Sequence, residues 1–245
     1  LLLFGGIAGA LLAAGLAIVL AVTFSGGVDP LWDRPAPAAD VRPPLARACP
    51  PPTDIPPDQP GTAAPSAPPA PAPSGPRTVD EAAGISYKAY GAPWEEWTDL
   101  WRGGTLDVAY KVGQHFVTEV YPEGSYHASI LSAAVPAAEN DALVLDLECV
   151  GRQVAADVRT KYYPEPNQIE PLRDSRVTLG GLPAWVTVFR LRFSRPGLRA
   201  KDELAAVATI DVGRPDAAIL YVSIPGTHRQ FDYVVDDVLA SVRRL

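Results

Sequence analysis

Residues 30–76 are so rich in proline that they restrict what this chain can fold into more than any other feature of its sequence. They hold 17 of the 27 prolines in a chain of 245 residues, interleaved mainly with alanine. Proline fixes its own φ angle and has no backbone N–H to donate, so such a stretch cannot build a core of helices or sheets. We therefore expect an extended or disordered Pro/Ala-rich linker over residues 25–77, partly in the polyproline II conformation.

This linker has two interpretations. Roughly 50 extended residues at about 3 Å each reach on the order of 100 Å, so it could be a stalk that carries a folded domain away from a membrane. It could equally be a passive spacer.

The first 24 residues contain neither a charged residue nor a proline. A helix rising about 1.5 Å per residue needs roughly 20 apolar residues to cross a bilayer. A cleaved signal peptide is the alternative, but its apolar core is usually about 7–15 residues long and "AVTFSGG" is a poor cleavage site. We expect a retained, single-pass transmembrane helix over residues 1–24. The flank "SGGVDPLWDRP" is not basic, which favours an extracytoplasmic position for the rest of the chain.

Residues 78–245 have the composition and length of one globular domain. The chain has a formal net charge of −7 and no basic run. An acidic surface of this kind disfavours nucleic acids and anionic lipids as partners.

Two periodicities alternate in this domain. Apolar residues at helical spacing predict a helix over 139–163 capped by Asn140 or Asp141, and a second over 227–245 that opens with a Thr227–Gln230 capping box. Strand-like runs predict three hairpins, over 105–135 with a "PEGS" turn, over 175–194 around Gly180–Gly181, and over 205–225. We expect an α+β fold, an antiparallel sheet of about six strands sandwiched with two main helices.

Four stretches carry a resemblance to a known family. They are "GISYKAYGAPWEEW", the helix after the first strands, "SRVTLGGLPAWVTVFRLRF" and "ILYVSIPGTHRQFDYVVDDVLASV". In their order and texture they resemble PsbP-like proteins, as found in the photosystem extrinsic protein and in membrane-anchored envelope proteins of actinobacteria. The resemblance implies a PsbP-like fold and a non-enzymatic accessory or binding module.

Three tryptophans, Trp94, Trp97 and Trp101, lie at helical spacing in "GAPWEEWTDLWRGG". Pro93 suits the first position of a short helix and Gly103–Gly104 its end. The three rings would then share one face. Exposing them would forfeit several kcal/mol of burial, which favours a core edge, while a recognition surface for a partner is the alternative.

No phosphate loop, nucleophile elbow or zinc-protease motif is present in the sequence. His115 and His127 could face each other across the first hairpin, with Ser125 nearby, and a base or ligand site could start there. Two histidines on a sheet are more often ordinary surface residues. We expect no catalytic set, no metal site and no cofactor.

The stretch "KYYPEPNQIEPLRDS" (161–175) is predicted to be the one long loop of the domain. Loops of this kind often carry binding residues, so Tyr162, Tyr163, Arg173 and Asp174 are the candidate binding residues here, beside the three tryptophans.

Cys49 and Cys149 are the only two cysteines. In an oxidising compartment they could form one disulfide that ties the linker to the domain. The alternative is two unrelated thiols, with Cys149 buried on its helix.

Three functions follow from these features. The first is an anchored, extracytoplasmic interaction module that docks to another envelope or membrane protein. The second is a carrier or sensor domain of a larger membrane protein, with a lipid or a sugar held between sheet and helices. The third is a hydrolase built around His115 and His127.

Overall fold

The computed structural model describes residues 42–49, 74–137 and 146–245. All of these belong to one compact unit, Arg42–Leu245. The predicted transmembrane helix 1–24 and most of the predicted linker lie outside the described residues. Within the described ranges, no helix is both long and apolar enough to cross a bilayer.

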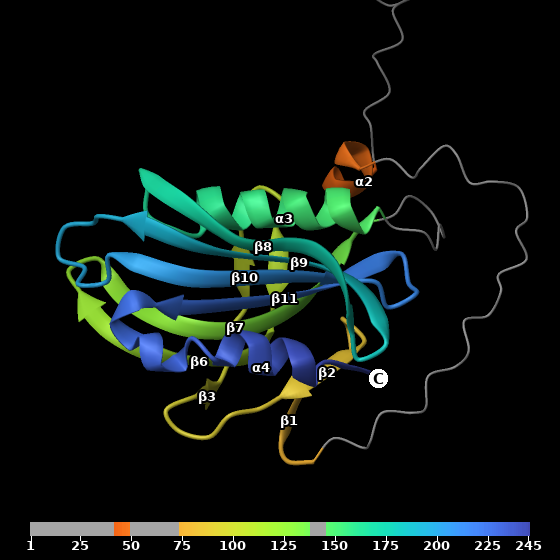
Figure 1. Ribbon diagram of the computed structural model, residues 1–245, viewed down its shortest axis with the longest axis horizontal. Helices are drawn as coiled ribbons and strands as arrows, with labels where there is room; N and C mark the ends of the chain where they lie inside the picture. Colours follow the sequence, from red (N-terminus) through yellow and green to blue (C-terminus); the bar gives the residue numbers. More distant parts are fainter. Residues whose placement is uncertain (1–41, 50–73, 138–145) are drawn as a thin grey trace, which may run out of the picture. The chain divides into compact units, whose positions relative to one another are not determined.

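The centre of the fold is a seven-stranded antiparallel sheet in the order β3-β6-β7-β11-β10-β9-β8 (Figure 1). Its strands are β3 (Glu95–Glu96), β6 (Val112–Tyr121), β7 (Gly124–Pro136), β8 (Asn167–Leu179), β9 (Leu182–Phe193), β10 (Asp202–Ile210) and β11 (Asp216–Pro225). Two small sheets accompany it. One consists of β1 (Arg77–Asp80), β2 (Ile85–Lys88) and β12 (Arg243–Arg244), and the other of β4 (Trp101–Gly103) and β5 (Val108–Tyr110).

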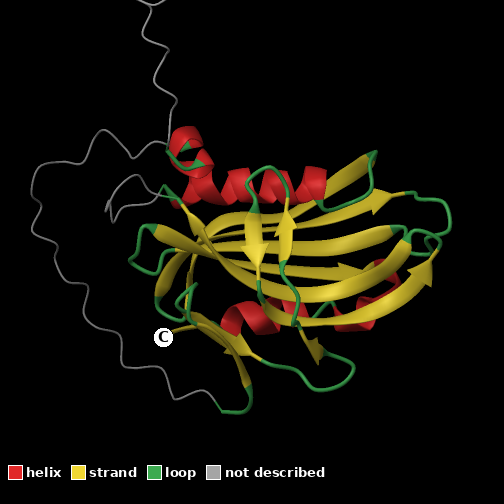
Figure 2. Cartoon of the chain, turned by 180° about the vertical axis from the view of Figure 1, so that it is seen from behind, coloured by secondary structure: helices red, strands yellow, loops and turns green. Residues whose placement is uncertain are grey.

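Helices cover both faces of the large sheet. The helix α3 (Leu147–Lys161) packs on one face, and the 3-10 helix η1 (Gly226–Phe231) with α4 (Val234–Ser241) packs on the other (Figures 1 and 2). The predicted α+β class and the three predicted hairpin turns are confirmed, with seven strands in place of about six. The first arm of the hairpin predicted over 105–135 is not one strand, because its residues divide between β5 and β6, which lie in different sheets.

Alternation along β9 separates the two cores. Trp185, Phe189 and Leu191 belong to the core beneath α3, while Val186 and Val188 belong to the core above α4. This is the division of faces that the sequence alternation predicts. Since helices cover both faces, the central strands β10 and β11 are apolar along almost their whole length.

Both predicted helices begin or end at other residues in the structure. α3 begins at Leu147, and its cap is Asp146, whose side chain accepts from the Cys149 amide at 3.0 Å. The predicted caps Asn140 and Asp141 lie outside the described residues. In the last segment the chain leaves helical geometry at His228, so the expected continuous helix over 227–245 is wrong.

The expected capping box at Thr227 is also absent, since η1 has no side-chain cap. The chain ends instead in β12, whose residues pair with β2. Pairing supplies backbone partners that a frayed helix end would lack, which explains why the helix stops at Ser241.

The predicted loop over 161–175 is wrong from Asn167 onward, where the chain enters β8. β8 is an edge strand and most of its side chains are exposed, so the apolar alternation that marks a strand is missing. Its register shifts between Pro171 and Arg173. A proline is tolerated at such a place because an edge strand leaves some N–H positions without a ladder partner.

One part of the predicted linker is folded onto the domain. The short helix α2 (Pro44–Ala48) buries Leu45 and Ala46, both 1% exposed. Cys49, at its end, forms a disulfide with Cys149 on α3. The expectation of an extended or disordered chain therefore does not hold for Pro44–Ala48, because an apolar side chain and a covalent link offset the cost of ordering it.

Candidate functional site

A cleft of about 290 Å³ lies on the α3 side of the large sheet, near the C-terminal end of that helix. Six aromatic side chains form its walls: Trp97, Trp101, Tyr126, Tyr162, Tyr163 and Tyr221. Its polar groups come from the strands beneath: Ser125, His127, Ser129, Glu203 and Ser223. Apolar walls with a few convergent polar groups are the usual construction of a small-molecule site.

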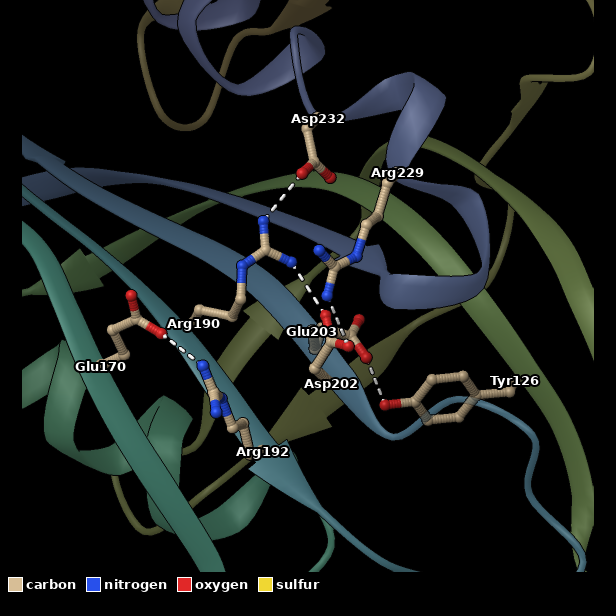
Figure 3. A network of polar contacts seen from close by, with 8 residues as sticks. All are labelled: Tyr126, Glu170, Arg190, Arg192, Asp202, Glu203, Arg229 and Asp232. Atoms are coloured by element: carbon tan, nitrogen blue, oxygen red, sulfur yellow. Dashed lines mark hydrogen bonds and ion pairs between the residues drawn. The ribbon is translucent and has the colours of Figure 1, made fainter.

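The buried carboxyl of Glu203 is the centre of the polar floor. This residue is only 1% exposed. Its carboxyl accepts hydrogen bonds from the hydroxyls of Tyr126 and Ser223, the first of which is drawn in Figure 3. Tyr163 extends the network, because its hydroxyl donates to Ser223 Oγ at 3.0 Å and lies 2.7 Å from the Tyr221 hydroxyl.

Burial raises the pKa of Glu203 to about 8, and the neighbouring Asp202 acts in the same direction. The hydrogen bonds from Ser223 and Tyr126 favour the carboxylate, but they do not outweigh the loss of hydration. At neutral pH the carboxyl is therefore mostly protonated. A protonated carboxyl at the base of a cleft is a marker of a functional site.

The arginines near this part of β10 are paired with carboxylates other than Glu203 (Figure 3). Asp202 accepts from Arg190 at 2.9 Å and from Arg229 at 2.8 Å. Arg190 also donates to Asp232 at 2.7 Å. Successive residues of a strand point to opposite faces, so Asp202 is ion-paired while Glu203 has only neutral partners.

The hairpin β4–β5 carries one wall of the cleft and is fastened to α3 by Asp157. This carboxylate accepts from the amide and hydroxyl of Thr105, at 2.8 and 2.7 Å, and from the Leu106 amide at 3.2 Å. A Cβ at Gly103 would lie 2.5 Å from the Tyr162 ring, and one at Gly104, whose φ is +70°, would lie 1.9 Å from Asp157. The two glycines therefore permit a close approach and do not end a helix.

The predicted tryptophan helix is wrong. The segment instead contributes two short strands, β3, which pairs with β6, and β4, which pairs with β5. Helical spacing therefore does not bring the three rings to one face. Trp94 is 6% exposed and packs against Phe116 in the core above α4, with ring centroids 4.9 Å apart. Trp97 and Trp101 are half-buried at the cleft.

The two histidines lie within hydrogen-bond reach of each other, as the hydrolase hypothesis requires. Their Nδ1 atoms are 3.3 Å apart, and the rings of Trp97 and His115 make a T-shaped contact with centroids 5.0 Å apart. Burial lowers the pKa of His127, and His115 acts in the same direction. In the described part of the chain, however, no hydrogen bond joins either ring to a serine or a carboxylate, and no group of three or more His, Cys, Asp or Glu could hold a metal ion.

The four candidates from the predicted loop divide into two pairs. Tyr162 and Tyr163 line the cleft. Arg173 forms an exposed ion pair with Asp236 at 2.8 Å. Asp174 accepts from the Trp185 indole at 2.6 Å, and also from Thr187 and Arg152, so its carboxylate serves the packing of β8, β9 and α3.

Sequence reasoning missed Glu203, Tyr126, Tyr221 and Ser223. The signal that could have found Glu203 is a single glutamate at the head of the apolar run "ELAAVATI". Burying a carboxyl is unfavourable without partners, so a glutamate that enters a central strand needs a reason. Tyr221 and Ser223 alternate with apolar residues in "ILYVSIP", which is the pattern of a strand with a polar stretch on one face.

No protein-family model and no curated protein matches this chain. Among solved structures it is similar to the solution structure of cyanobacterial PsbP (CyanoP) from Synechocystis sp. PCC 6803, with 14% identity and a TM-score of 0.43 over 69% of this chain and 92% of the other. It is also similar to LpqN, involved in cell envelope biogenesis of Mycobacterium tuberculosis, with 13% identity and a TM-score of 0.40 over 65% and 82%.

A third similar structure comes from Bacteroides thetaiotaomicron, with 14% identity and a TM-score of 0.38. The match covers 69% of this chain but only 48% of that protein. Both groups named by the sequence resemblance, a PsbP protein and a mycobacterial envelope protein, are thus among the structural neighbours. The identities are too low to transfer any residue role to this chain.

Proposed function

We propose that this chain is a non-enzymatic, extracytoplasmic binding module of the cell envelope that takes a small ligand into the cleft on the α3 side of the sheet. The observation that carries the proposal is the cleft itself, where six aromatic side chains surround a carboxyl that is 1% exposed. Aromatic walls provide apolar contact area, and a few fixed polar groups provide orientation. Such a site suits a ligand smaller than a protein domain.

The arrangement favours binding over catalysis. A nucleophilic serine needs a base, and the base needs an orienting acid. Ser125 and His127 both line the cleft, yet the hydrogen bond of His127 goes to His115 and not to an acid. Glu203 is engaged by the hydroxyls of Tyr126 and Ser223.

Three features support a position outside the cytoplasm. Residues 1–24 have the length and composition of a membrane anchor, and the proline-rich linker follows them. The disulfide between Cys49 and Cys149 is of a kind that persists in oxidising compartments. Protease treatment of intact cells should therefore degrade the domain and leave a short membrane-bound fragment. Recovery of an intact soluble form in the cytosol would contradict this placement.

Binding of small probes tests the function directly. With indole nitrogens labelled by ¹⁵N, a probe in the cleft shifts the signals of Trp97 and Trp101 and leaves that of Trp94 in place. Ser125→Phe fills the exposed mouth of the cleft and should abolish these shifts. The matched control is Leu172→Phe, at an exposed position of β8. Equal binding by both variants, or no shift with neutral, cationic, anionic and sugar probes, would refute the proposal.

A second candidate function is docking to another envelope or membrane protein, and the edge strand β8 favours it. β8 is 13 residues long, lies at the edge of the sheet and is mostly exposed. Such a strand offers backbone groups for an added strand from a partner. Cross-linking in intact membranes from a probe placed at Leu172 should capture this partner. If cross-linking yields only the protein itself, docking of a partner through β8 is contradicted.

A further inference from the structure

We propose that the ligand of the cleft is an organic cation, carrying an amine, guanidine or quaternary ammonium group, and that the carboxyl of Glu203 is its counter-ion. This inference rests on the proposed function, since it names the chemical class that the same cleft takes.

The charge balance of the cleft floor favours a cation. Glu203 is buried and accepts hydrogen bonds only from the neutral hydroxyls of Tyr126 and Ser223. Arg190 and Arg229 are both engaged by Asp202 on the other face of the sheet. A buried carboxylate is stable only when a positive charge accompanies it. Within the described ranges no side chain supplies that charge to Glu203, and a cationic ligand would.

The aromatic walls of the cleft also favour a cation. The rings of Trp101, Tyr162 and Tyr221 all line the cleft. The ring centroid of Trp101 lies 4.6 Å from that of Tyr162 and 6.2 Å from that of Tyr221. Aromatic faces carry a negative quadrupole and attract ammonium and guanidinium groups, and several rings around one space form the usual site for quaternary ammonium. The chain's net charge of −7 favours approach of a cation.

The protonation of the groups around Glu203 further distinguishes a cation from a neutral ligand. The titratable groups nearest Glu203 are Tyr126 and His127 on β7, Asp202 on β10, Tyr162 and Tyr163 after α3, and Tyr221 on β11. Burial raises the pKa of each of these tyrosines, so they stay neutral. Burial and His115 lower the pKa of His127, which favours its neutral form and limits its repulsion of a cation.

Without a bound cation, Glu203 is therefore mostly protonated below about pH 8. A bound cation favours the carboxylate, so binding releases the carboxyl proton to solvent. By linkage, the affinity for a cation rises with pH, by up to tenfold per pH unit below about pH 8.

The test uses choline and its uncharged carbon isostere 3,3-dimethylbutanol, which have the same shape. We expect the wild-type protein to bind choline at least about tenfold more tightly at pH 7.5, the effect of roughly one unit of pKa. Calorimetry in two buffers of different ionisation enthalpy should show proton release, and choline affinity should rise from pH 6 to pH 8. These measurements need no variant, so they stand even where a substitution impairs folding.

A variant pair then assigns the effect to one carboxyl. Glu203→Gln should lose the preference for choline and the proton release, and keep the affinity for 3,3-dimethylbutanol. Glu170→Gln, an exposed glutamate on β8, should behave as the wild type. Tighter binding of 3,3-dimethylbutanol, 3,3-dimethylbutyrate or glucose than of choline would overturn the inference and leave the binding function standing. Absence of binding by all four probes would overturn both.

Discussion

The hydroxyl of Tyr126 on β7 donates a hydrogen bond to the carboxyl of Glu203 on β10, although β11 lies between these two strands in the sheet. The bond therefore spans the floor of the cleft from one side to the other. It also favours the carboxylate, since it lowers the pKa of Glu203 against the effect of burial. One contact thus links the shape of the cleft to the charge of its central group.

Replacing Tyr126 by Phe should lower the free energy of unfolding by about 1–3 kcal/mol, because a buried carboxyl loses a donor that the apolar ring cannot replace. It should also raise the pKa of Glu203 further. Urea unfolding at pH 7 measures the first effect and ¹³C NMR of the labelled carboxyl the second. Tyr121→Phe on the neighbouring β6 is the control, with a change below about 0.5 kcal/mol. Equal losses from both variants would contradict a special role for Tyr126.

The raised pKa of Glu203 predicts a stability that falls as pH rises. Its pKa is about 8 in the folded protein against an ordinary value of 4.5, so the folded state holds a proton that the unfolded state has lost between these values. The contribution is fully present below about pH 4.5 and is lost as pH rises through about 8, with a slope of up to about 1.4 kcal/mol per pH unit.

The measurement is the unfolding free energy at several pH values from 5 to 8, for the wild type and for Glu203→Gln. The glutamine cannot ionise, so the difference between the two proteins isolates this carboxyl. Asp174, Asp202 and Asp237 have lowered pKa values, and their contributions are lost only in more acidic solution. Parallel pH profiles for both proteins would show that Glu203 is not protonated in the folded state.

The sheet and its hairpins could be predicted because the turn residues and the strand pattern of each hairpin lie close together in the sequence. Gly180–Gly181 lies between two β-branched runs, and those residues do form the turn between β8 and β9. Neighbouring residues of β9 also face opposite sides of the sheet, since Phe189 and Val188 lie in different cores. Period-two patterning is a local property, and a single sequence contains it in full.

The site could not be predicted in the same way, because its parts meet only through tertiary structure. Glu203 and Tyr126 are 77 positions apart, and their strands are not neighbours in the sheet. The helix predicted for the tryptophan segment is wrong for a related reason. The helical spacing of its tryptophans is accidental, and the pairing of β3 with β6 and of β4 with β5 determines its structure. Likewise Gly103 and Gly104 read as a helix end, while their close contacts with α3 come from a distant part of the chain.

Reduction of the Cys49–Cys149 disulfide should release α2 without unfolding the sheet. Ordering residues 42–49 costs on the order of 10 kcal/mol at about 1–2 kcal/mol each. Burial of Leu45, Ala46 and Cys49 returns roughly 3–5 kcal/mol, so the covalent link is what holds the segment in place. Hydrogen exchange should therefore accelerate in Pro44–Ala48 after reduction, while β10 and β11 keep their protection.

The double variant Cys49→Ser, Cys149→Ser should show the same exchange with or without reductant. This control separates loss of the disulfide from other effects of the reductant. Continued protection of Pro44–Ala48 in the double variant would mean that apolar contact alone docks the segment.

Arg173 and Asp174 are neighbours on β8 that should differ in effect. Arg173→Ala removes an exposed ion pair with Asp236 and should change stability by less than about 0.5 kcal/mol. Asp174→Ala leaves the indole N–H of the buried Trp185 without its partner and should destabilise by about 1–3 kcal/mol. Neither should alter binding in the cleft. A loss of choline affinity in either folded variant would show that β8 contributes to the binding site.

Asp157 should control the cleft from a distance, because it fastens the hairpin that carries Trp101. Its carboxylate is 7% exposed and accepts from two amides and one hydroxyl of Thr105 and Leu106. Asp157→Ala removes all three acceptor contacts and should lower stability by about 2–4 kcal/mol, since hydrogen bonds to a charged group are the stronger ones. Freed from α3, the hairpin should let Trp101 turn toward water, with a red shift of its fluorescence and weaker choline binding. Asp107→Asn on the same hairpin alters only an exposed ion pair with Arg102 and should leave both readouts unchanged. If Asp157→Ala keeps wild-type fluorescence and affinity, the wall of the cleft is held by ring packing around Trp101 and not by this carboxylate.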